Sequence, residues 1–434
     1  MPETPSNNTL IIRQTFLAAL PILLIVALLM ACEAQTAERT AATPAGPAQS
    51  QRVSSQGVSS VLPGVDVWRQ RGYEPLVGRR IGLITNATGR DAAGRLTAEV
   101  LAASGEVDLV ALFSPEHGFR GVEEGDVASA QDASTGLPVH SLYGDTRRPT
   151  QEMLAGLDGL VFDIQDVGTR FYTYATTMAY AMEEAASHGL PFVVLDRPNP
   201  ITGLYAEGPV IDGELLSFVG YVPIPLRHGM TMGELALYFN AELGIAADLT
   251  VIPMQGWRRD QWYDATGLLW VNPSPNMRNL EEALLYPAVG ALEYTNISVG
   301  RGTDEPFEWL GAPWIDGPAL ARQLNGAALP GVRFIPRKRT PSSSVFAGEV
   351  CNGVDLVVTD RNAFSASRTA ITLATTLFAL HGDDWDPERL PPLWGRPEVI
   401  DQLRAGMTPE RIAEAWQKDL DAFLAARSRY LLYD

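Results

Sequence analysis

The stretch "VDLVALFSPEHG", residues 107–118, decides the fold class. The apolar run inside it, 109–113, has the length of a buried strand and is stopped by Pro115. Glu116 and His117 follow, so a carboxyl group and an imidazole are predicted where a strand ends. In open parallel sheets, ligands bind beyond the carboxyl ends of the strands. The stretch therefore indicates an α/β fold with a ligand site at one edge of its sheet.

Strand and helix patterns alternate on both sides of this stretch. Strands are predicted at 79–86, 107–116, 137–144, 157–166, 190–197 and 248–257, and helices at 94–104, 171–189 and 231–244. This alternation is typical of βαβ units with a mostly parallel sheet. Further strands at 331–339 and 353–361, with helices at 367–382 and 409–431, predict a second, smaller α/β domain. We place the domains at 58–240 and 241–434.

The N-terminal segment is predicted to be a lipoprotein signal peptide, residues 1–32. Its apolar part, 16–31, is short for a membrane-spanning helix and suits a signal-peptide core. The ending "LLMAC" resembles a bacterial lipobox, in which Cys32 would be lipidated; the alternative is an uncleaved N-terminal anchor. Residues 33–57 are rich in Ala, Thr, Pro, Gln and Ser and predict a flexible tether. We expect a lipid-anchored envelope protein that faces the periplasm, and Glu33 favours the outer membrane.

Charge and cysteine content narrow the class of protein. The chain has 434 residues, with 51 acidic and 33 basic side chains and a net charge of −18. Such a surface repels phosphate backbones, so nucleic acid is not an expected partner. There are two cysteines. If Cys32 carries lipid, Cys351 has no partner for a disulfide and is expected to be a small buried residue.

Signatures of the common cofactors are missing from the sequence. The first predicted strand–helix turn contains neither GxGxxG nor GxxxxGK, which disfavours a nucleotide cofactor. The five histidines form neither HxH nor HExxH, and there is no cysteine cluster, so we expect no metal. No GxSxG is present, which disfavours a serine hydrolase. We therefore expect catalysis, if any, to use side chains alone, without a cofactor.

Polar residues recur at four consecutive predicted strand ends, which would line one rim of the sheet. They are Asn86, Glu116, His117, Asp163, Asp166, Asp196 and Arg197. Glu116 is the leading catalytic candidate, because a carboxyl group in a partly dry site beside an imidazole can transfer protons. His117 would orient it or bind a substrate hydroxyl, unless it is structural. Asp163 would face the cleft, and Asp166 would either join it or cap a helix starting near Thr169.

Several later segments add candidates for substrate binding. Arg170 and Tyr172 follow the rim, and a rigid tyrosine suits a sugar ring, although helical tyrosines more often only pack. His228, Asn276, Glu293 and Asn296 lie in polar segments further along the chain. Arg301 stands between two glycines, where a guanidinium can hold a carboxylate with two hydrogen bonds; the alternative is an arginine that points to water.

A set of motifs in fixed order resembles one known family. The motifs are "SPEHGFRG", "DGLVFDIQDVGTRFYTY", "PLRHGMTMGELA", "PSPNM", "TNISVGRGTDEPFE" and "GAPWI". They resemble the peptidoglycan exo-β-N-acetylmuramidase family over about residues 60–430. The resemblance implies a Rossmann-like domain, a smaller C-terminal domain that closes the cleft, and release of terminal non-reducing N-acetylmuramic acid from peptidoglycan-derived saccharides.

The resemblance also implies roles for single residues. The family's proton donor falls on Glu116 and its adjacent histidine on His117, while Asp163, His228 and Arg301 match further motif positions. Tyr294 stands where the resemblance leads us to expect a small residue, which would change a subsite.

The chemistry of glycoside cleavage leaves some of these assignments open. A second carboxyl group is usually needed, and Asp163 or Glu293 would supply it, unless the 2-acetamido group of the sugar attacks instead. Arg301 and Arg170 are the candidates for the lactyl carboxylate. Two other functions fit the residues: a metal-assisted deacetylase of the same polymer and a catalytically inactive sugar-binding lipoprotein.

Overall fold

A computed structural model describes residues 61–434 of the chain. The predicted signal peptide, Cys32 and the predicted tether lie outside the described residues. The described residues belong to one compact unit. Within the described part of the chain, no helix has the length and apolar character needed to cross a membrane.

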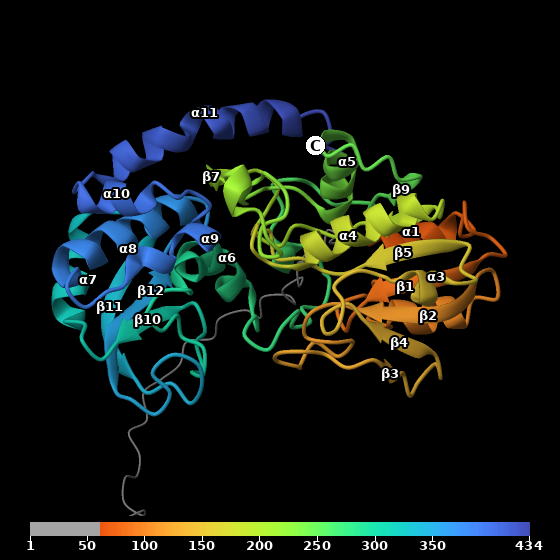
Figure 1. The fold of residues 1–434 in the computed structure, drawn as a ribbon, viewed down its shortest axis with the longest axis horizontal. Helices are drawn as coiled ribbons and strands as arrows, with labels where there is room; N and C mark the ends of the chain where they lie inside the picture. The colour runs from red at the N-terminus through yellow and green to blue at the C-terminus, as the bar shows by residue number, and fades with distance from the viewer. Residues whose placement is uncertain (1–60) are drawn as a thin grey trace, which may run out of the picture. The chain divides into compact units, whose positions relative to one another are not determined.

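The centre of the N-terminal lobe is a seven-stranded sheet (Figure 1). Its spatial order is β3-β4-β2-β1-β5-β6-β9, and only the β3–β4 pair is antiparallel. The strands are β1 Arg80–Thr85, β2 Asp108–Ser114, β3 Ala130–Gln131, β4 Pro138–Ser141, β5 Gly159–Asp163, β6 Phe192–Leu195 and β9 Leu249–Ile252. The predicted α/β class with a mostly parallel sheet is confirmed.

Alternating side chains bury both faces of this sheet, as expected for strands covered on two sides. In β5, Leu160 and Phe162 enter one apolar cluster, whereas Val161 enters another. The helices are α1 Gly64–Gln70, α2 Thr97–Ala102, α3 Gln151–Leu154, α4 Tyr174–Ser187 and α5 Met232–Glu242. Residues of α1 and α2 share the cluster of Val161, while those of α4 and α5 share the cluster of Leu160. Helices therefore cover both faces of the sheet, so a ligand can reach it only at the strand ends.

The C-terminal lobe contains a smaller antiparallel sheet of order β10-β12-β11. Its strands are β10 Trp309–Ala312, β11 Val332–Arg339 and β12 Cys351–Val358, and a two-stranded ribbon, β7 Glu207–Val210 and β8 Pro225–Arg227, lies before it in the chain. The helices are α6 Leu280–Val289, α7 Gly317–Gly326, α8 Ala366–His381, α9 Pro391–Trp394, α10 Val399–Arg404 and α11 Pro409–Arg427. Cys351 is a free, buried thiol, as predicted.

The large sheet extends beyond the domain boundary predicted at 240. β9, at 249–252, pairs in parallel with β6 and forms one edge of that sheet. The helix before it, α5, begins with a capping box, in which Thr231 and Glu234 exchange side-chain-to-backbone hydrogen bonds. The first lobe therefore includes α5 and β9, and the chain enters the second lobe after β9.

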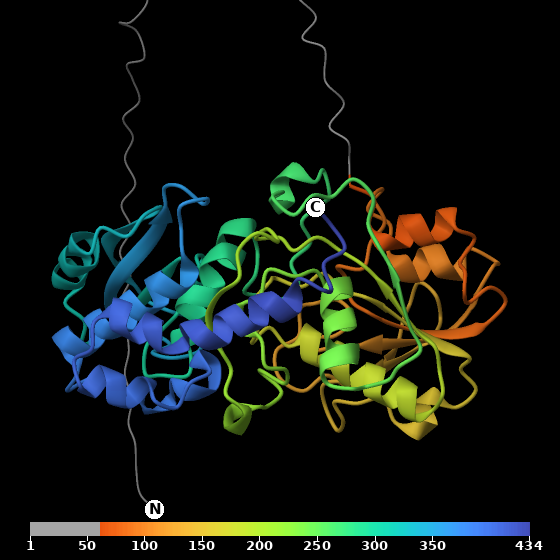
Figure 2. The same ribbon diagram turned by 90° about the horizontal axis from the view of Figure 1, so that it is seen from above.

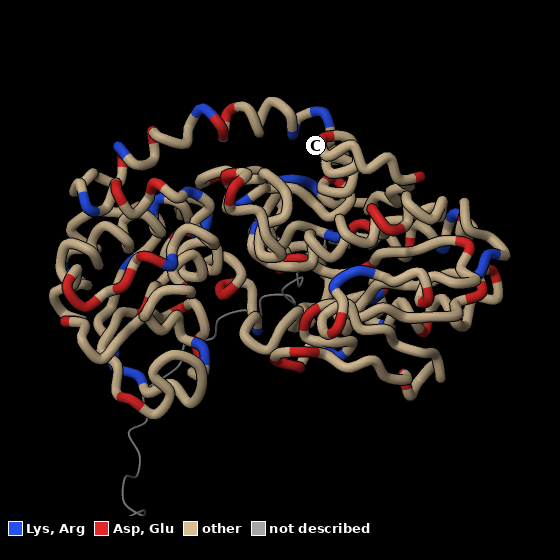
Figure 3. Tube along the Cα trace, in the orientation of Figure 1, with Lys and Arg blue, Asp and Glu red and all other residues tan. Residues whose placement is uncertain are grey.

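The last helix returns the C-terminus to the N-terminal lobe. In Figures 1 and 2, α11 runs from beside α10 across to α5. The tail beyond it is anchored there, because the Tyr433 hydroxyl donates to Asp196 Oδ2 at 2.5 Å and Leu432 N donates to Glu234 Oε1 at 2.9 Å. Acidic and basic positions are interspersed along both lobes (Figure 3).

Candidate active site

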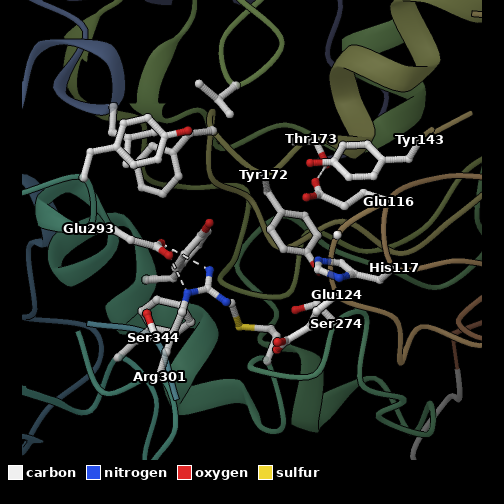
Figure 4. A pocket seen from close by; sticks show the side chains of 18 of the residues that line it. Glu116, His117, Glu124, Tyr143, Tyr172, Thr173, Ser274, Glu293, Arg301 and Ser344 are labelled. Carbon is white, nitrogen blue, oxygen red and sulfur yellow. Dashed lines mark hydrogen bonds and ion pairs between the residues drawn. The ribbon is translucent and has the colours of Figure 1, made fainter. Parts of the chain in front are cut away.

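A cavity of about 450 Å³ is lined by residues of both lobes. Figure 4 shows Glu116, His117, Tyr143 and Thr173 on one side of it and Glu293 and Arg301 on the other. Of the predicted site residues, the structure brings Glu116, His117, Tyr172, Glu293 and Arg301 together at this cavity.

Glu116 lies just beyond the end of β2 and is half-buried. The strand ends at Ser114, two residues earlier than predicted, so the loop carries the carboxyl group away from the sheet. The Thr173 hydroxyl donates to Glu116 Oε2 at 2.5 Å. Because Thr173 is the N-cap residue of α4, the positive end of that helix faces the carboxylate. Glu116 is thus oriented on a rigid element while it remains in contact with the cavity.

His117 adopts a left-handed backbone conformation, with φ of 70°. Such a conformation is costly for a residue with a side chain and recurs at functional sites. Its Nδ1 lies 2.8 Å from the backbone oxygen of Glu123. Since a carbonyl oxygen can only accept, Nδ1 carries a proton toward it, and Nε2 is the ring nitrogen left to contact a ligand.

Tyr143 completes the surroundings of Glu116. Burial and the nearby Glu116 carboxylate raise the pKa of the Tyr143 hydroxyl to about 12. The hydroxyl therefore stays protonated at neutral pH and can serve as a hydrogen-bond donor. The Glu116 carboxylate thus lies between two neutral hydroxyl groups, those of Tyr143 and Thr173.

Arg301 and Glu293 form an ion pair on the opposite wall. Arg301 Nε donates to Glu293 Oε1, and Nη2 donates to Oε2 at 3.2 Å. Burial disfavours the charged guanidinium, but the Glu293 carboxylate raises the pKa of Arg301 above its ordinary value. Gly302, with φ of 79°, holds the turn, because a Cβ there would lie 2.5 Å from Ser343 N. The pair uses one edge of the guanidinium, and Nη1 makes no hydrogen bond within residues 61–434.

The remaining wall combines one further carboxylate with aromatic rings. The carboxylate is that of Glu124, which accepts a hydrogen bond from Asn276 Nδ2 at 3.2 Å. Asn276 is therefore tied to the cavity through Glu124. Tyr172 packs edge-on against Tyr174 and Tyr286, and burial raises its pKa well above the ordinary value.

Asp163 does not face the cavity, in contrast to the prediction. It is fully buried, and both of its oxygens accept hydrogen bonds from Arg197, at 2.5 and 2.9 Å. The Thr97 hydroxyl donates to the same carboxylate at 2.5 Å. Asp163 and Arg197 thus neutralise each other's charge and pair by hydrogen bonds inside the fold. Asp163 is also the last residue of β5, so Gln165 and Asp166 lie in a loop rather than on the strand.

Other predicted rim residues are buried in local networks. Asn86 Oδ1 accepts from Thr88 N at 2.9 Å, and its amide donates to the Tyr174 hydroxyl. Asp166 Oδ2 accepts from Gly168 N at 2.7 Å and lies 3.6 Å from His228 Nε2. Asp166 does not cap α4, because that helix begins at Tyr174 with Thr173 as its N-cap residue.

Three further candidates hold segments of the fold together. Arg170 is buried and donates to the carbonyl oxygens of Pro209 and Leu393, at 2.7 and 2.5 Å, so it is not placed to bind a lactyl carboxylate. Burial lowers its pKa to about 9. Asp196 binds the tail through Tyr433, and Asn296 donates to Asp384 O at 2.8 Å.

Sequence reasoning missed Thr173, Tyr143 and Glu124. Thr173 was assigned to the interior of a helix, and the helix start that exposes its hydroxyl is only visible in the structure. Tyr143 follows a short strand, at a strand end that was not included in the rim. Glu124 had one available signal, namely a polar, glycine-rich loop directly after the Glu116–His117 pair.

Within residues 61–434, no group of three or more His, Cys, Asp or Glu side chains is placed to hold a metal ion.

Comparisons with known proteins agree with the motifs over nearly the whole described chain. Models described as "Exo-beta-N-acetylmuramidase NamZ, N-terminal" and "C-terminal" match residues 81–281 and 284–433. A curated Bacillus subtilis (strain 168) protein, peptidoglycan beta-N-acetylmuramidase NamZ, is 47% identical over 378 residues, which are 86% of this chain and 91% of that protein.

Two solved structures from Bacteroides fragilis NCTC 9343, both described as DUF1343 family proteins, share the fold. One has a TM-score of 0.80 at 40% identity and covers 86% of this chain and 99% of its own. The other has a TM-score of 0.71 at 32% identity and covers 87% and 99%. The predicted fold and family are both confirmed. This chain belongs to the exo-β-N-acetylmuramidase NamZ family.

Proposed function

We propose that the protein is a glycoside hydrolase that releases N-acetylmuramic acid from the non-reducing end of peptidoglycan fragments. Family membership and the 47% identical muramidase of Bacillus subtilis support this activity. The observation that carries it in the structure is the pairing of a carboxyl group, Glu116, with a guanidinium, Arg301, across one cavity. The first suits the glycosidic oxygen, and the second suits the carboxylate that distinguishes N-acetylmuramic acid from N-acetylglucosamine.

Glu116 is the proton donor of this proposal. Glycoside cleavage needs an acid that protonates the leaving oxygen, and the acid must touch the bond from a fixed position. The hydroxyl of Thr173 provides that position by its hydrogen bond to Oε2. His117, with Nδ1 held by a carbonyl oxygen, offers Nε2 to a sugar hydroxyl.

Glu293 is the better candidate for the second carboxyl group. Of the two residues considered for this role, only Glu293 lines the cavity, whereas Asp163 is fully buried and paired with Arg197. If the 2-acetamido group attacks the anomeric carbon, Glu293 would orient that group instead of reacting.

Arg301 has donors left for the lactyl carboxylate. Glu293 occupies the Nε and Nη2 positions, and a guanidinium carries five N–H groups in a fixed plane. A second carboxylate can therefore bind at Nη1 without breaking the ion pair. This contact would favour N-acetylmuramic acid over N-acetylglucosamine, which lacks the lactyl group.

The test uses the full-length protein in a mild non-ionic detergent. It is incubated with chromogenic β-glycosides of N-acetylmuramic acid and of N-acetylglucosamine, each with and without EDTA. We expect release from the first substrate only, and the same rate with EDTA. Sugar binding without release would favour an inactive binding protein, and loss of release with EDTA would favour metal-assisted chemistry.

We also propose that the protein is lipid-anchored through Cys32 and faces the periplasm, with the outer membrane as the favoured location. The "LLMAC" sequence and the length of the apolar segment support this. Globomycin is expected to block maturation of the wild-type precursor and to have no effect on Cys32→Ala. Identical processing of both forms would contradict the anchor.

A further inference from the structure

We infer that the cavity continues into a binding region for the leaving saccharide, formed by Tyr294 of the C-terminal lobe and by Tyr143, Phe218 and Arg147 of the N-terminal lobe. We call it the aromatic end of the cavity. The inference rests on the proposed function. It assigns the sugar-binding surface on the far side of the scissile bond, which neither the motifs nor the proposed catalytic residues include.

The positions of Glu116 and Arg301 give the cavity a direction. The proton donor must touch the glycosidic oxygen, which joins the N-acetylmuramic acid to the leaving sugar. If the lactyl carboxylate is bound by Arg301, the N-acetylmuramic acid lies between Arg301 and Glu116. The leaving sugar then lies on the side of Glu116 away from Arg301. Figure 4 shows Tyr143 at that side and Ser344 beside Arg301 at the other.

The N-terminal part of the aromatic end is a packed group of rings. Tyr143 and Phe218 lie 5.7 Å apart between ring centroids. The Arg147 guanidinium covers both, at 4.2 Å from the Phe218 ring and 5.0 Å from the Tyr143 ring. These contacts hold Arg147 in place, so its donors are ordered before a ligand binds. Tyr143 and Val219, the neighbour of Phe218, line the cavity.

Arg147 is free to bind a ligand. The adjacent Arg148 pairs with Glu183 at 2.6 Å, whereas Arg147 is exposed and makes no ion pair within residues 61–434. A guanidinium fixed on aromatic rings but without a carboxylate can donate to hydroxyl and acetamido oxygens of a sugar.

Tyr294 closes the region from the other lobe. It lines the cavity, and 37% of its surface is exposed. Its hydroxyl is near charges of both lobes: besides burial, the carboxylates of Glu293 and Glu116 raise its pKa, while Arg389 and Arg147 lower it. Tyr294 and Tyr143 thus line the same cavity from the two lobes, together with Glu116, the carboxyl group that protonates the leaving oxygen.

The chemistry of this region suits an uncharged pyranose. An exposed tyrosine offers a flat apolar face at low conformational cost, and the C–H face of a sugar can pack on it. Arg147 supplies polar contacts at the edge of the ring. The residue that follows N-acetylmuramic acid in peptidoglycan, N-acetylglucosamine, has such an apolar face and an acetamido oxygen.

The experiment compares two substrates with the full-length protein. One is the disaccharide of N-acetylmuramic acid and N-acetylglucosamine, and the other is the methyl β-glycoside of N-acetylmuramic acid, which has no leaving sugar. Release of N-acetylmuramic acid gives kcat/KM for each. The ratio of the two values isolates binding of the leaving sugar, because both leaving groups are alkyl alcohols.

We expect Tyr294→Ala to lower this ratio by about tenfold, through loss of kcat/KM on the disaccharide. Tyr294→Phe should keep the ratio within about twofold, because the ring remains. Arg147→Met, a variant of the other lobe that keeps an apolar stem over the rings, should lower the ratio by about threefold. Leu269→Ala, at a 66% exposed apolar residue outside the cavity wall, is the control and should leave it unchanged.

A ratio unchanged in both Tyr294→Ala and Arg147→Met would overturn the inference, and so would an equal loss on both substrates. If wild-type protein hydrolyses neither substrate, the proposed function itself fails. The two failures are therefore distinguishable by the wild-type rates.

Discussion

The strand-end cluster of the large sheet and the cavity are two polar regions, and they differ in what their charges contact. In the strand-end cluster, Asp163 and Arg197 are 0% and 4% exposed and bind each other. In the cavity, Glu293 and Arg301 are 22% and 26% exposed. A buried pair whose bonding capacity is used within the fold acts on stability, whereas a partly exposed pair with unused donors can act on a ligand. The comparison predicts separate effects of substitution in the two regions.

The largest expected effect is that of Glu116→Gln on turnover. The amide keeps the shape of the side chain but cannot protonate a leaving oxygen, so kcat should fall by about a thousandfold. Because Glu116 is only half-buried, the free energy of unfolding should change by less than about 1 kcal/mol. Initial rates and urea unfolding measure the two quantities. Near-normal turnover would remove Glu116 from the role of proton donor.

Asp163→Asn should produce the opposite pattern. It leaves Arg197 buried without its counter-charge, which costs about 3–5 kcal/mol of stability. Rates measured at a temperature where the variant is folded should keep the wild-type KM. Asp108→Asn is the matched control, because Asp108 pairs with Arg80 at 3.8 Å with both side chains more than half exposed, and it should cost less than about 1 kcal/mol. A stable but inactive Asp163→Asn protein would contradict the structural role.

Asp196 gives the strand-end cluster a pH dependence. Burial raises its pKa from 3.8 to about 7. The folded state therefore binds this proton more tightly than the unfolded state does. The resulting stabilisation is complete below the unfolded pKa, declines as the pH rises, and is lost once the pH passes the folded pKa.

The difference between wild type and Asp196→Asn isolates this contribution. Between about pH 5 and about pH 8, the wild-type free energy of unfolding should fall by about 2–3 kcal/mol relative to that of the variant. Urea unfolding at both pH values measures it. Parallel pH dependence in the two proteins would show that Asp196 ionises without cost, its charge being carried by donors such as Tyr433 and Thr231.

The sheet was predictable because its strands and helices have distinct periods and are separated by turn residues. It was harder to predict which polar side chains at the strand ends face the cavity. Glu116 was found because the run before it stops at a proline, and the loop then carries the side chain into the cavity. Asp163 follows the same sequence rule, yet it is buried, because Arg197 from the next strand end pairs with it. A contact between residues 34 positions apart is not readable from either segment alone.

The second lobe contributes cavity residues that do not lie at strand ends of the large sheet. Glu293 and Arg301 reach the cavity from a glycine-rich segment after α6, and the sequence indicated them by composition rather than by a position in the fold. Tyr294 was noticed only as an unexpected large residue. Its place at the aromatic end depends on how the two lobes pack, and that packing comes from one apolar core that runs through both.

Arg301→Lys tests the specificity of the cavity. The ammonium group keeps the charge but cannot bind Glu293 and a second carboxylate in one plane. We expect the preference for N-acetylmuramic acid over N-acetylglucosamine glycosides to fall by about tenfold, with stability changed by less than about 1 kcal/mol. Competition between the two free sugars for binding measures the same preference without turnover. An unchanged preference would place the lactyl group elsewhere in the cavity.

The smallest expected effect belongs to Cys351, which is buried like Asp163 but carries no charge. Burial raises the pKa of its thiol to about 11, so the thiolate is scarce at neutral pH and is a poor target for alkylation. Removal of the thiol leaves no buried charge without a counter-charge, so Cys351→Ala should cost only about 1 kcal/mol of stability, from lost packing. Turnover should stay within about twofold of wild type, both in the variant and after treatment of the wild type with iodoacetamide. Inactivation by iodoacetamide in the wild type but not in Cys351→Ala would mean that this thiol reaches solvent and affects the cavity. In that case burial alone would not distinguish structural from reactive side chains in this fold. Whether a side chain has a charged partner would then be the better criterion.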